Sequence, residues 1–257
     1  MKLHLITSLF LIIGFFCASS SGQQKRRVMT TKAKATLAQK SAEIGQSAVV
    51  VDETLAVLRK NPTLFSESVH RMSRGRLVQI VGTAEADGVK FYRVTVPPRS
   101  FGWVQADAVF GKFRGGDEAR FAALVQALNG FDQIEAAVEF LKFYPAAASR
   151  PAILLLFGDL VEDLCTKLST DATRRLKRLE MTASGAPLHS YYLNFVSLDR
   201  YRKLGIVFLF NSAARQFHYE GASWREIVTK FPNSPEAVEA QKRLDALKVK
   251  MEKTSAK

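Results

Sequence analysis

The chain has 257 residues and a formal net charge of +13, from 37 Lys and Arg against 24 Asp and Glu. Its apolar content of 47% is too high for an intrinsically disordered chain, and its length allows one large or two modest domains. The basic balance favours anionic partners, namely acidic lipid heads, cell-wall polymers or nucleic acid.

The N-terminus has the pattern of an export signal. Lys2 provides a positive start, and small residues follow an apolar run over residues 5–17. That run is well short of the roughly 20 residues that cross a bilayer. We expect cleavage after Gly22, with cleavage after Ser20 or retention as a membrane anchor as alternatives. The mature chain would then lie in the periplasm or cell envelope, or outside the cell, where nucleic acid is the least favoured partner.

The cysteines exclude two classes of site. Cys17 lies inside the export signal, where lipidation is an alternative to its removal, so the mature chain would keep Cys165 alone. A single cysteine makes no intramolecular disulfide and no cysteine metal cluster. Cys165 has helical spacing with Phe157, Val161 and Leu168, which favours a buried thiol over a catalytic nucleophile.

The positive charge is concentrated in two tails. Residues 23–47 hold six basic residues and one acid, and residues 248–257 hold four lysines and one acid. We interpret residues 23–47 as a basic linker and residues 251–257 as a basic tail. Such tails would attract anionic surfaces, or would only keep the protein soluble.

Residues 48–110 have the pattern of short strands joined by turns. Tyr92, Val94 and Val96 alternate with Phe91, Arg93 and Thr95, which is the period of a β-strand. Asp87-Gly88 is a strong hairpin signal, and residues 101–104 form the last predicted strand.

The order of these strands and turns, which ends in Gly102-Trp103-Val104, resembles a bacterial SH3-type (SH3b) domain. The resemblance implies a small β-barrel in which Trp103 is either part of the fold or a ligand platform. Our candidate ligand groove consists of Arg59, Tyr92, Arg99 and Trp103. Rings beside guanidinium groups would suit a peptide or a glycan-linked carboxylate.

The apolar period changes from 2 to 3.6 after a Gly-rich hinge at residues 111–116. This change predicts that residues 45–112 and 117–257 fold separately. Helices are predicted around residues 121–128, 134–141, 153–168, 223–231 and 235–250, with a further helix starting at Thr170-Asp171. Residues 182–222 are the least regular, and their apolar run 204–210 suits either a buried helix or a strand.

Two segments, residues 138–160 and 224–247, echo each other. Each contains a helix, an aromatic-proline pair, a short loop and a second helix. This pattern resembles tetratricopeptide-like repeats, in which stacked helix pairs bury a shared core. We therefore predict an α+β fold by domains, with an SH3-like barrel followed by an all-α, TPR-like domain. The predicted parts are 1–22 (signal), 23–47 (linker), 48–110 (barrel), 111–116 (hinge), 117–250 (helical domain) and 251–257 (tail).

No catalytic or metal-binding motif is recognised. After the signal the histidines are His70, His189 and His218, which lack the spacing of a zinc site, and no phosphate-binding glycine loop occurs. We expect no cofactor and a non-enzymatic adaptor of the cell envelope. Its barrel would bind cell-wall material or a peptide, and its helices a protein. The alternative is an accessory or cryptic hydrolase of wall peptides, because such hydrolases often accompany SH3b domains.

The tails generate the first prediction. Deleting residues 23–45 and 248–257 should weaken binding to anionic vesicles or isolated sacculi, because most of the excess charge is removed. Salt should mimic the deletion, since exposed charges are screened over roughly 8 Å at physiological ionic strength. Equal binding by both proteins in a co-sedimentation assay across salt would mean that the tails only solubilise the chain.

Overall fold

The computed structural model describes residues 41–98 and 100–252, without the side chain of Arg178. These residues belong to one compact unit that begins at Lys40. The predicted signal, most of the predicted linker, Arg99 and residues 253–257 lie outside the described residues. Among the helices that are described, none is long and apolar enough to cross a membrane.

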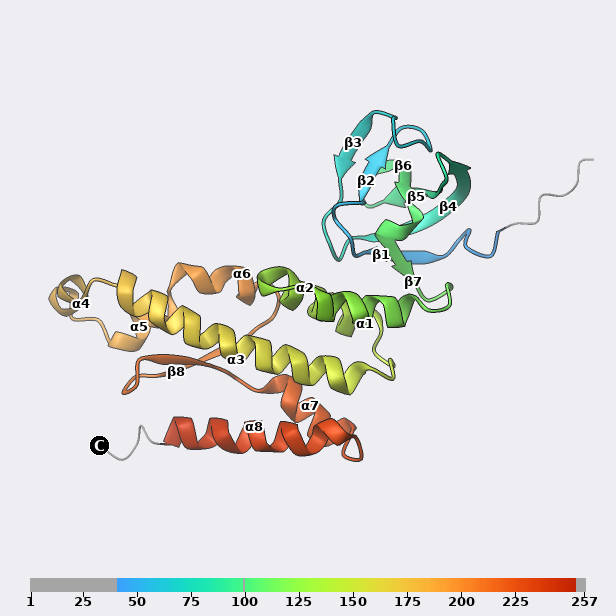
Figure 1. Cartoon of the computed structure of the whole chain (residues 1–257). Coiled ribbons are helices and arrows are strands. Elements are labelled where there is room, and N and C mark those ends of the chain that lie inside the picture. The colour runs from blue at the N-terminus through green and yellow to red at the C-terminus, as the bar shows by residue number, and fades with distance from the viewer. Residues whose placement is uncertain (1–40, 99, 253–257) are drawn as a thin grey trace, which may run out of the picture. The chain divides into compact units, whose positions relative to one another are not determined.

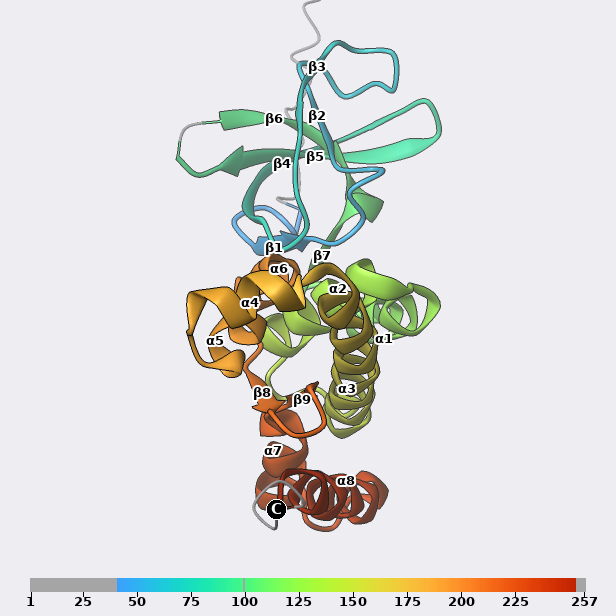
Figure 2. The same ribbon diagram turned by 90° about the vertical axis from the view of Figure 1, so that its left-hand side faces the viewer.

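An antiparallel sheet precedes a helical part (Figure 1). The seven strands are hydrogen-bonded in the order β3-β2-β6-β5-β4-β1-β7, and Figure 2 shows that the sheet is strongly curved. The strands are β1 (Ser47–Val50), β2 (Val57–Arg59), β3 (Ser68–Arg71), β4 (Leu77–Ala86), β5 (Val89–Val96), β6 (Ser100–Gln105) and β7 (Val109–Gly111). The 3-10 turn η1 (Ala106–Ala108) connects β6 to β7.

The predicted hairpin at Asp87-Gly88 is confirmed. Ala86 pairs with Val89, so these two residues alone form the turn between β4 and β5. Asp87 and Gly88 have φ values of 55° and 71°, as a turn that follows the twist of the strands requires. The turn fixes the register of the two longest strands, with Ile80 opposite Val94.

Alternation along the strands separates the two faces of the sheet. The inner face carries a buried apolar cluster that includes Leu58, Ile80, Val94 and Val104. The outer face carries the residues between them in sequence, including Arg93. Because successive side chains point to opposite faces, the side chains that alternate with these core residues point to the outer face.

The last residues of the predicted linker are attached to the sheet. Glu43 accepts hydrogen bonds from Lys90 Nζ at 2.6 and 2.7 Å and from the Tyr92 hydroxyl at 2.8 Å. Burial raises the pKa of Glu43, but these bonds and that from Ser41 outweigh it and lower the pKa. A tail deletion that leaves the fold intact therefore has to end at residue 40, before Glu43.

The helical part begins as predicted. It contains α1 (Asp117–Ala127), α2 (Gly130–Phe143), α3 (Arg150–Arg175), α4 (Arg178–Ser184), α5 (Leu188–Leu193), η2 (Val196–Leu198), α6 (Asp199–Arg202), α7 (Ala222–Lys230) and α8 (Pro235–Glu252). The first helix ends before Asn129-Gly130 and the second before Tyr144-Pro145, at the predicted stop signals. Pro235 is the first residue of α8, where its missing N–H costs no helical hydrogen bond.

The predicted start of a new helix at Thr170-Asp171 is wrong, because α3 continues through Arg175. Ser169 and Thr170 would favour a helix start, but their hydroxyls donate back to the carbonyls of Cys165 and Thr166 at 2.6 and 3.2 Å. Such bonds to the preceding turn accommodate Ser and Thr inside a helix.

The prediction of an all-α C-terminal domain is also wrong, because this part contains a β-hairpin. Strands β8 (Phe208–Asn211) and β9 (Gln216–Tyr219) pair with each other, so the apolar run 204–210 ends in a strand. Side chains of α3 accept hydrogen bonds from the N–H groups on the outer edge of β9. Phe217 N–H donates to Ser169 Oγ at 2.7 Å, and Tyr219 N–H donates to Glu162 Oε2 at 2.9 Å. Side chains of a helix thus take the place of a third strand.

The sheet and the helices share a core. Val49, Val51 and Phe110 belong to the same buried cluster as Phe121 and Phe140 of the helices. A fragment of residues 45–112 would expose the three sheet residues to water. We therefore expect such a fragment to be less stable than the same residues in the whole chain.

Glu162 is the common acceptor in a partly buried polar network. Its Oε1 lies 2.9 Å from His218 Nδ1 and accepts a hydrogen bond from Lys250 Nζ at 2.7 Å, while Oε2 bonds Tyr219 N–H. Burial opposes ionisation of Glu162, but these bonds outweigh it and hold its pKa at about 2. The network ties α3 to the hairpin and to the end of α8.

Replacing Glu162 by Gln should destabilise the protein by roughly 2–3 kcal/mol at neutral pH. Because the pKa is about 2 in the folded chain and 4.5 without these contacts, the carboxylate stabilises fully above 4.5 and loses its effect as pH falls towards 2. Urea unfolding at several pH values measures this. Glu162→Gln should flatten the pH dependence in that window, whereas Glu180→Gln, at an exposed pair with Lys177, should leave it unchanged. Parallel curves for parent and Glu162→Gln would contradict the network.

Candidate functional site

A row of three side chains crosses the outer face of the sheet. Trp103 of β6 pairs with Arg93 of β5 on one side and with Arg59 of β2 on the other. Directly opposed residues in an antiparallel pair have Cβ atoms about 4.5–5.5 Å apart. The indole of Trp103 is therefore flanked by two arginines from neighbouring strands.

Gly102 allows β2 to lie close enough for this row to form. A Cβ atom at Gly102 would lie 2.7 Å from the Arg59 carbonyl oxygen and 2.8 Å from Leu58 Cγ, both of which are too close for any side chain. A glycine inside a strand often marks such a close approach of another backbone. The residue before Trp103 thus sets the distance between the strands that carry Trp103 and Arg59.

A groove of about 490 Å³ lies over Arg93 and Trp103 of this row. Its apolar surface comes from Trp103, Phe101 and Val69, of which Phe101 is 64% exposed and Val69 47% exposed. Arg93 and Lys60 supply its charged groups, and Ser100 and Gly102 complete the lining. Exposed apolar side chains gathered around a half-buried indole mark a surface suited to a ligand.

The groove has an excess of positive charge. Lys60 is paired with Glu67 at 2.8 Å, but Arg93 has no hydrogen-bond or ion-pair partner among the described residues. Arg59 Nη1 donates to the Ser66 carbonyl at 2.8 Å, while its Nε is buried without a partner in the part of the chain that the structure describes. A carboxylate bound here would find the unpaired guanidinium group of Arg93 beside an aromatic face.

The loop between β2 and β3, which borders the groove, is held in place. Asp87 accepts hydrogen bonds from the Thr63 hydroxyl at 2.6 Å and from Leu64 N–H at 2.8 Å. These two bonds lower the pKa of Asp87. Phe65, at the tip of this loop, is 89% exposed and does not line the groove.

The structure pairs two of the four predicted groove residues, Arg59 and Trp103, but only Trp103 lines the groove. Tyr92 lies on the inner face, fully buried, with its hydroxyl bonded to Glu43, and it does not line the groove. Burial first, and Glu43 second, raise the pKa of Tyr92. Arg99 lies outside the described residues. The sequence reasoning missed Arg93, although alternation from a buried Tyr92 places it outside.

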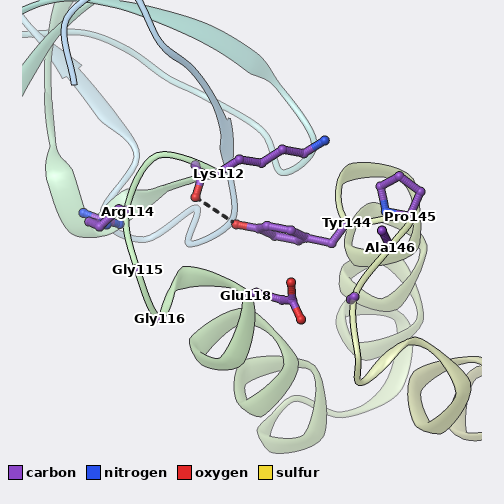
Figure 3. Close-up of a pocket in the computed structure, with 10 residues that line it drawn as sticks. Lys112, Arg114, Gly115, Gly116, Glu118, Tyr144, Pro145 and Ala146 are labelled. Carbon is purple, nitrogen blue, oxygen red and sulfur yellow. Dashed lines mark hydrogen bonds between the residues drawn. The ribbon is translucent and has the colours of Figure 1, made fainter. Parts of the chain in front are cut away.

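A second pocket of about 400 Å³ adjoins residues 111–116 (Figure 3). Its charged groups are Lys112, Arg114 and Glu118, but Arg114 is already used by Asp117 and by the carbonyls of Ala106 and Val109. The Tyr144 hydroxyl, drawn in Figure 3, donates to the Gly111 carbonyl at 3.2 Å. Lys112 and Glu118 have no hydrogen-bond or ion-pair partner among the described residues, but they carry opposite charges, so this pocket lacks the unbalanced positive charge of the groove.

The buried position predicted for Cys165 is confirmed. The thiol is fully buried in the helical core, and burial, with a smaller effect of Glu162, raises its pKa. Such a thiol stays protonated and is a poor nucleophile. Across residues 41–98 and 100–252, no group of three His, Cys, Asp or Glu side chains could hold a metal ion.

No protein-family model, curated protein or solved structure matches this chain.

The close approach at Gly102 generates a prediction. Gly102→Ala should destabilise the protein by roughly 1–3 kcal/mol, because the new methyl meets the backbone of β2. Gly115→Ala is the matched control, since a Cβ there has nothing within 4 Å and should change stability by less than about 0.5 kcal/mol. Thermal or urea unfolding measures both. Equal stability of the two variants would show that β2 is not held against β6 as described.

Proposed function

We propose that this chain is a non-enzymatic binding protein of the cell envelope. In this proposal the sheet is an SH3-like barrel of the bacterial type, and its groove binds cell-wall material or a peptide through a carboxylate. The observation that carries it is Trp103 held between Arg59 and Arg93, with Arg93 unpaired among the described residues. The export pattern at residues 1–22 supports the location.

The chemistry of the groove fits such a ligand. Wall peptides are extended, carry free carboxylates and are linked to sugar rings. Sugar or side-chain faces can stack on Trp103 and Phe101, and a carboxylate can accept charge-assisted hydrogen bonds from Arg93. Hydrogen bonds to charged groups contribute roughly 1.5–3 kcal/mol each.

The helical part supports an adaptor with a second partner. Along α2 and α3, the first helix pair of the proposed TPR-like arrangement, a groove of about 410 Å³ is lined by Phe131, Leu160 and Leu164. Asp163 and Lys167 on its rim have no partner among the described residues. An apolar floor with unpaired charges of both signs suits a protein segment.

Binding to isolated sacculi tests the proposal. Trp103→Ala and Arg93→Glu in the full chain should each lower the bound fraction at least about fivefold, because each removes one of the two recognition elements. Phe65→Ala removes a more exposed ring outside the groove, and Lys230→Glu reverses an exposed charge on α7, so both should bind as the parent does.

Co-sedimentation with sacculi at physiological salt measures the bound fraction, and circular dichroism checks that each variant is folded. Undiminished binding by folded Trp103→Ala and Arg93→Glu would exclude the groove as the site. Loss of binding only on deletion of residues 23–40 would assign the interaction to the tail.

A further inference from the structure

The short helix α4 presents an uncovered apolar side chain. Leu179 is 86% exposed, although it lies within a helix. Figure 1 shows α4 beyond the C-terminal end of α3, on the outside of the helical part. No described residue covers Leu179, so this leucine contributes nothing to the core.

Cationic groups precede this leucine closely in the chain. Arg174 and Arg175, at the end of α3, both pair with the single carboxylate of Asp171, at 2.8 and 3.3 Å. Two guanidinium groups that share one carboxylate leave a net positive charge. Lys177 is paired with Glu180, and both of these side chains are more than two thirds exposed.

The hairpin adds a further cation to the same end. Arg215, in the turn between β8 and β9, lines one pocket of about 280 Å³ together with Met181 and Leu188. Arg215 has no hydrogen-bond or ion-pair partner among the described residues. Arg215 therefore lies beside α4, and the cations at the end of α3 directly precede α4 in the chain.

An exposed leucine with cations near it is the combination expected of a surface that binds a membrane. The cations attract the acidic headgroups, at about 1 kcal/mol for each basic residue near the surface, and the leucine enters the apolar boundary. We infer that this end of the helical part binds an anionic lipid bilayer, with Leu179 inserted below the headgroups. We name Leu179, Arg174, Arg175 and Arg215 the α4 surface.

A polyanionic wall polymer is the competing occupant, and the leucine decides between the two. A polymer would use the cations and gain nothing from Leu179, because it has no apolar interior for a leucine to enter. The α4 surface is separate from the groove of Trp103, so this inference does not rest on the proposed function.

The apolar run at residues 5–17 could itself bring the full chain to vesicles. The test therefore follows a fluorophore placed at a single position of the α4 surface. Leu179→Trp places a fluorophore at the α4 surface, and Val238→Trp places one at a similarly exposed position on α8, beside Glu239. Vesicles of brominated phosphatidylglycerol quench an indole that enters the apolar boundary. After subtraction of the parent signal, quenching at position 179 should exceed that at 238 at least about threefold.

A charge variant completes the test. Adding Arg174→Gln and Arg175→Gln to Leu179→Trp should at least halve the quenching on anionic vesicles. Leu179→Ser should lower vesicle binding of the α4 surface but leave binding to a soluble anionic polysaccharide unchanged. Equal quenching at positions 179 and 238 would overturn insertion. Vesicle binding that falls with the arginine changes but not with Leu179→Ser would assign the surface to polyanions.

Discussion

The close approach of β2 to β6 at Gly102 is the constraint on which the sheet and its groove both depend. On the inner side, the missing side chain of Gly102 allows Leu58 to reach the core, because a Cβ at Gly102 would lie 2.8 Å from Leu58 Cγ. On the outer side, the same close approach sets Arg59 opposite Trp103. One residue without a side chain therefore couples the packing of the core to the geometry of the candidate site.

The site is built on strands, and this gives it a fixed geometry before any ligand arrives. Arg93 and Trp103 are held by the continuous β5–β6 pairing from Phe91 to Val96. The neighbouring loop is bound to Asp87, and the start of the sheet is bound through Glu43. A preorganised site loses less entropy on binding than a flexible one. The helical part contributes to the same rigidity, because Phe110 at the end of the sheet is buried among its helices.

Local patterns in the sequence predicted much of the fold. The Asp87-Gly88 turn, the alternation in β5 and the helix ends at Ala127 and Phe143 follow from neighbouring residues alone. A strand was only one of two alternatives for residues 204–210, and the pairing of β8 with β9 could not be predicted, because the edge of β9 is satisfied by Ser169 and Glu162, which are 48 and 57 residues away. In the candidate groove the sequence predicted Trp103, and it also predicted Arg59, which pairs with Trp103 but does not line the groove. Tyr92 was predicted in the groove and Arg93 was not, because alternation alone does not say which residues of a strand face inwards.

The central claim is that a ligand contacts Trp103 beside Arg93, and the chain carries its own control for it. Its two tryptophans are Trp103 in the groove and Trp224, which is buried in the helical core. In a ¹⁵N–¹H spectrum each gives one indole Nε1 signal, which can be followed during titration with a soluble wall peptide that bears a free carboxylate. The account predicts that the Trp103 signal shifts and saturates while the Trp224 signal stays in place, and that Arg93→Glu abolishes the shift. A Trp103 signal that remains unmoved while the peptide binds would contradict the account.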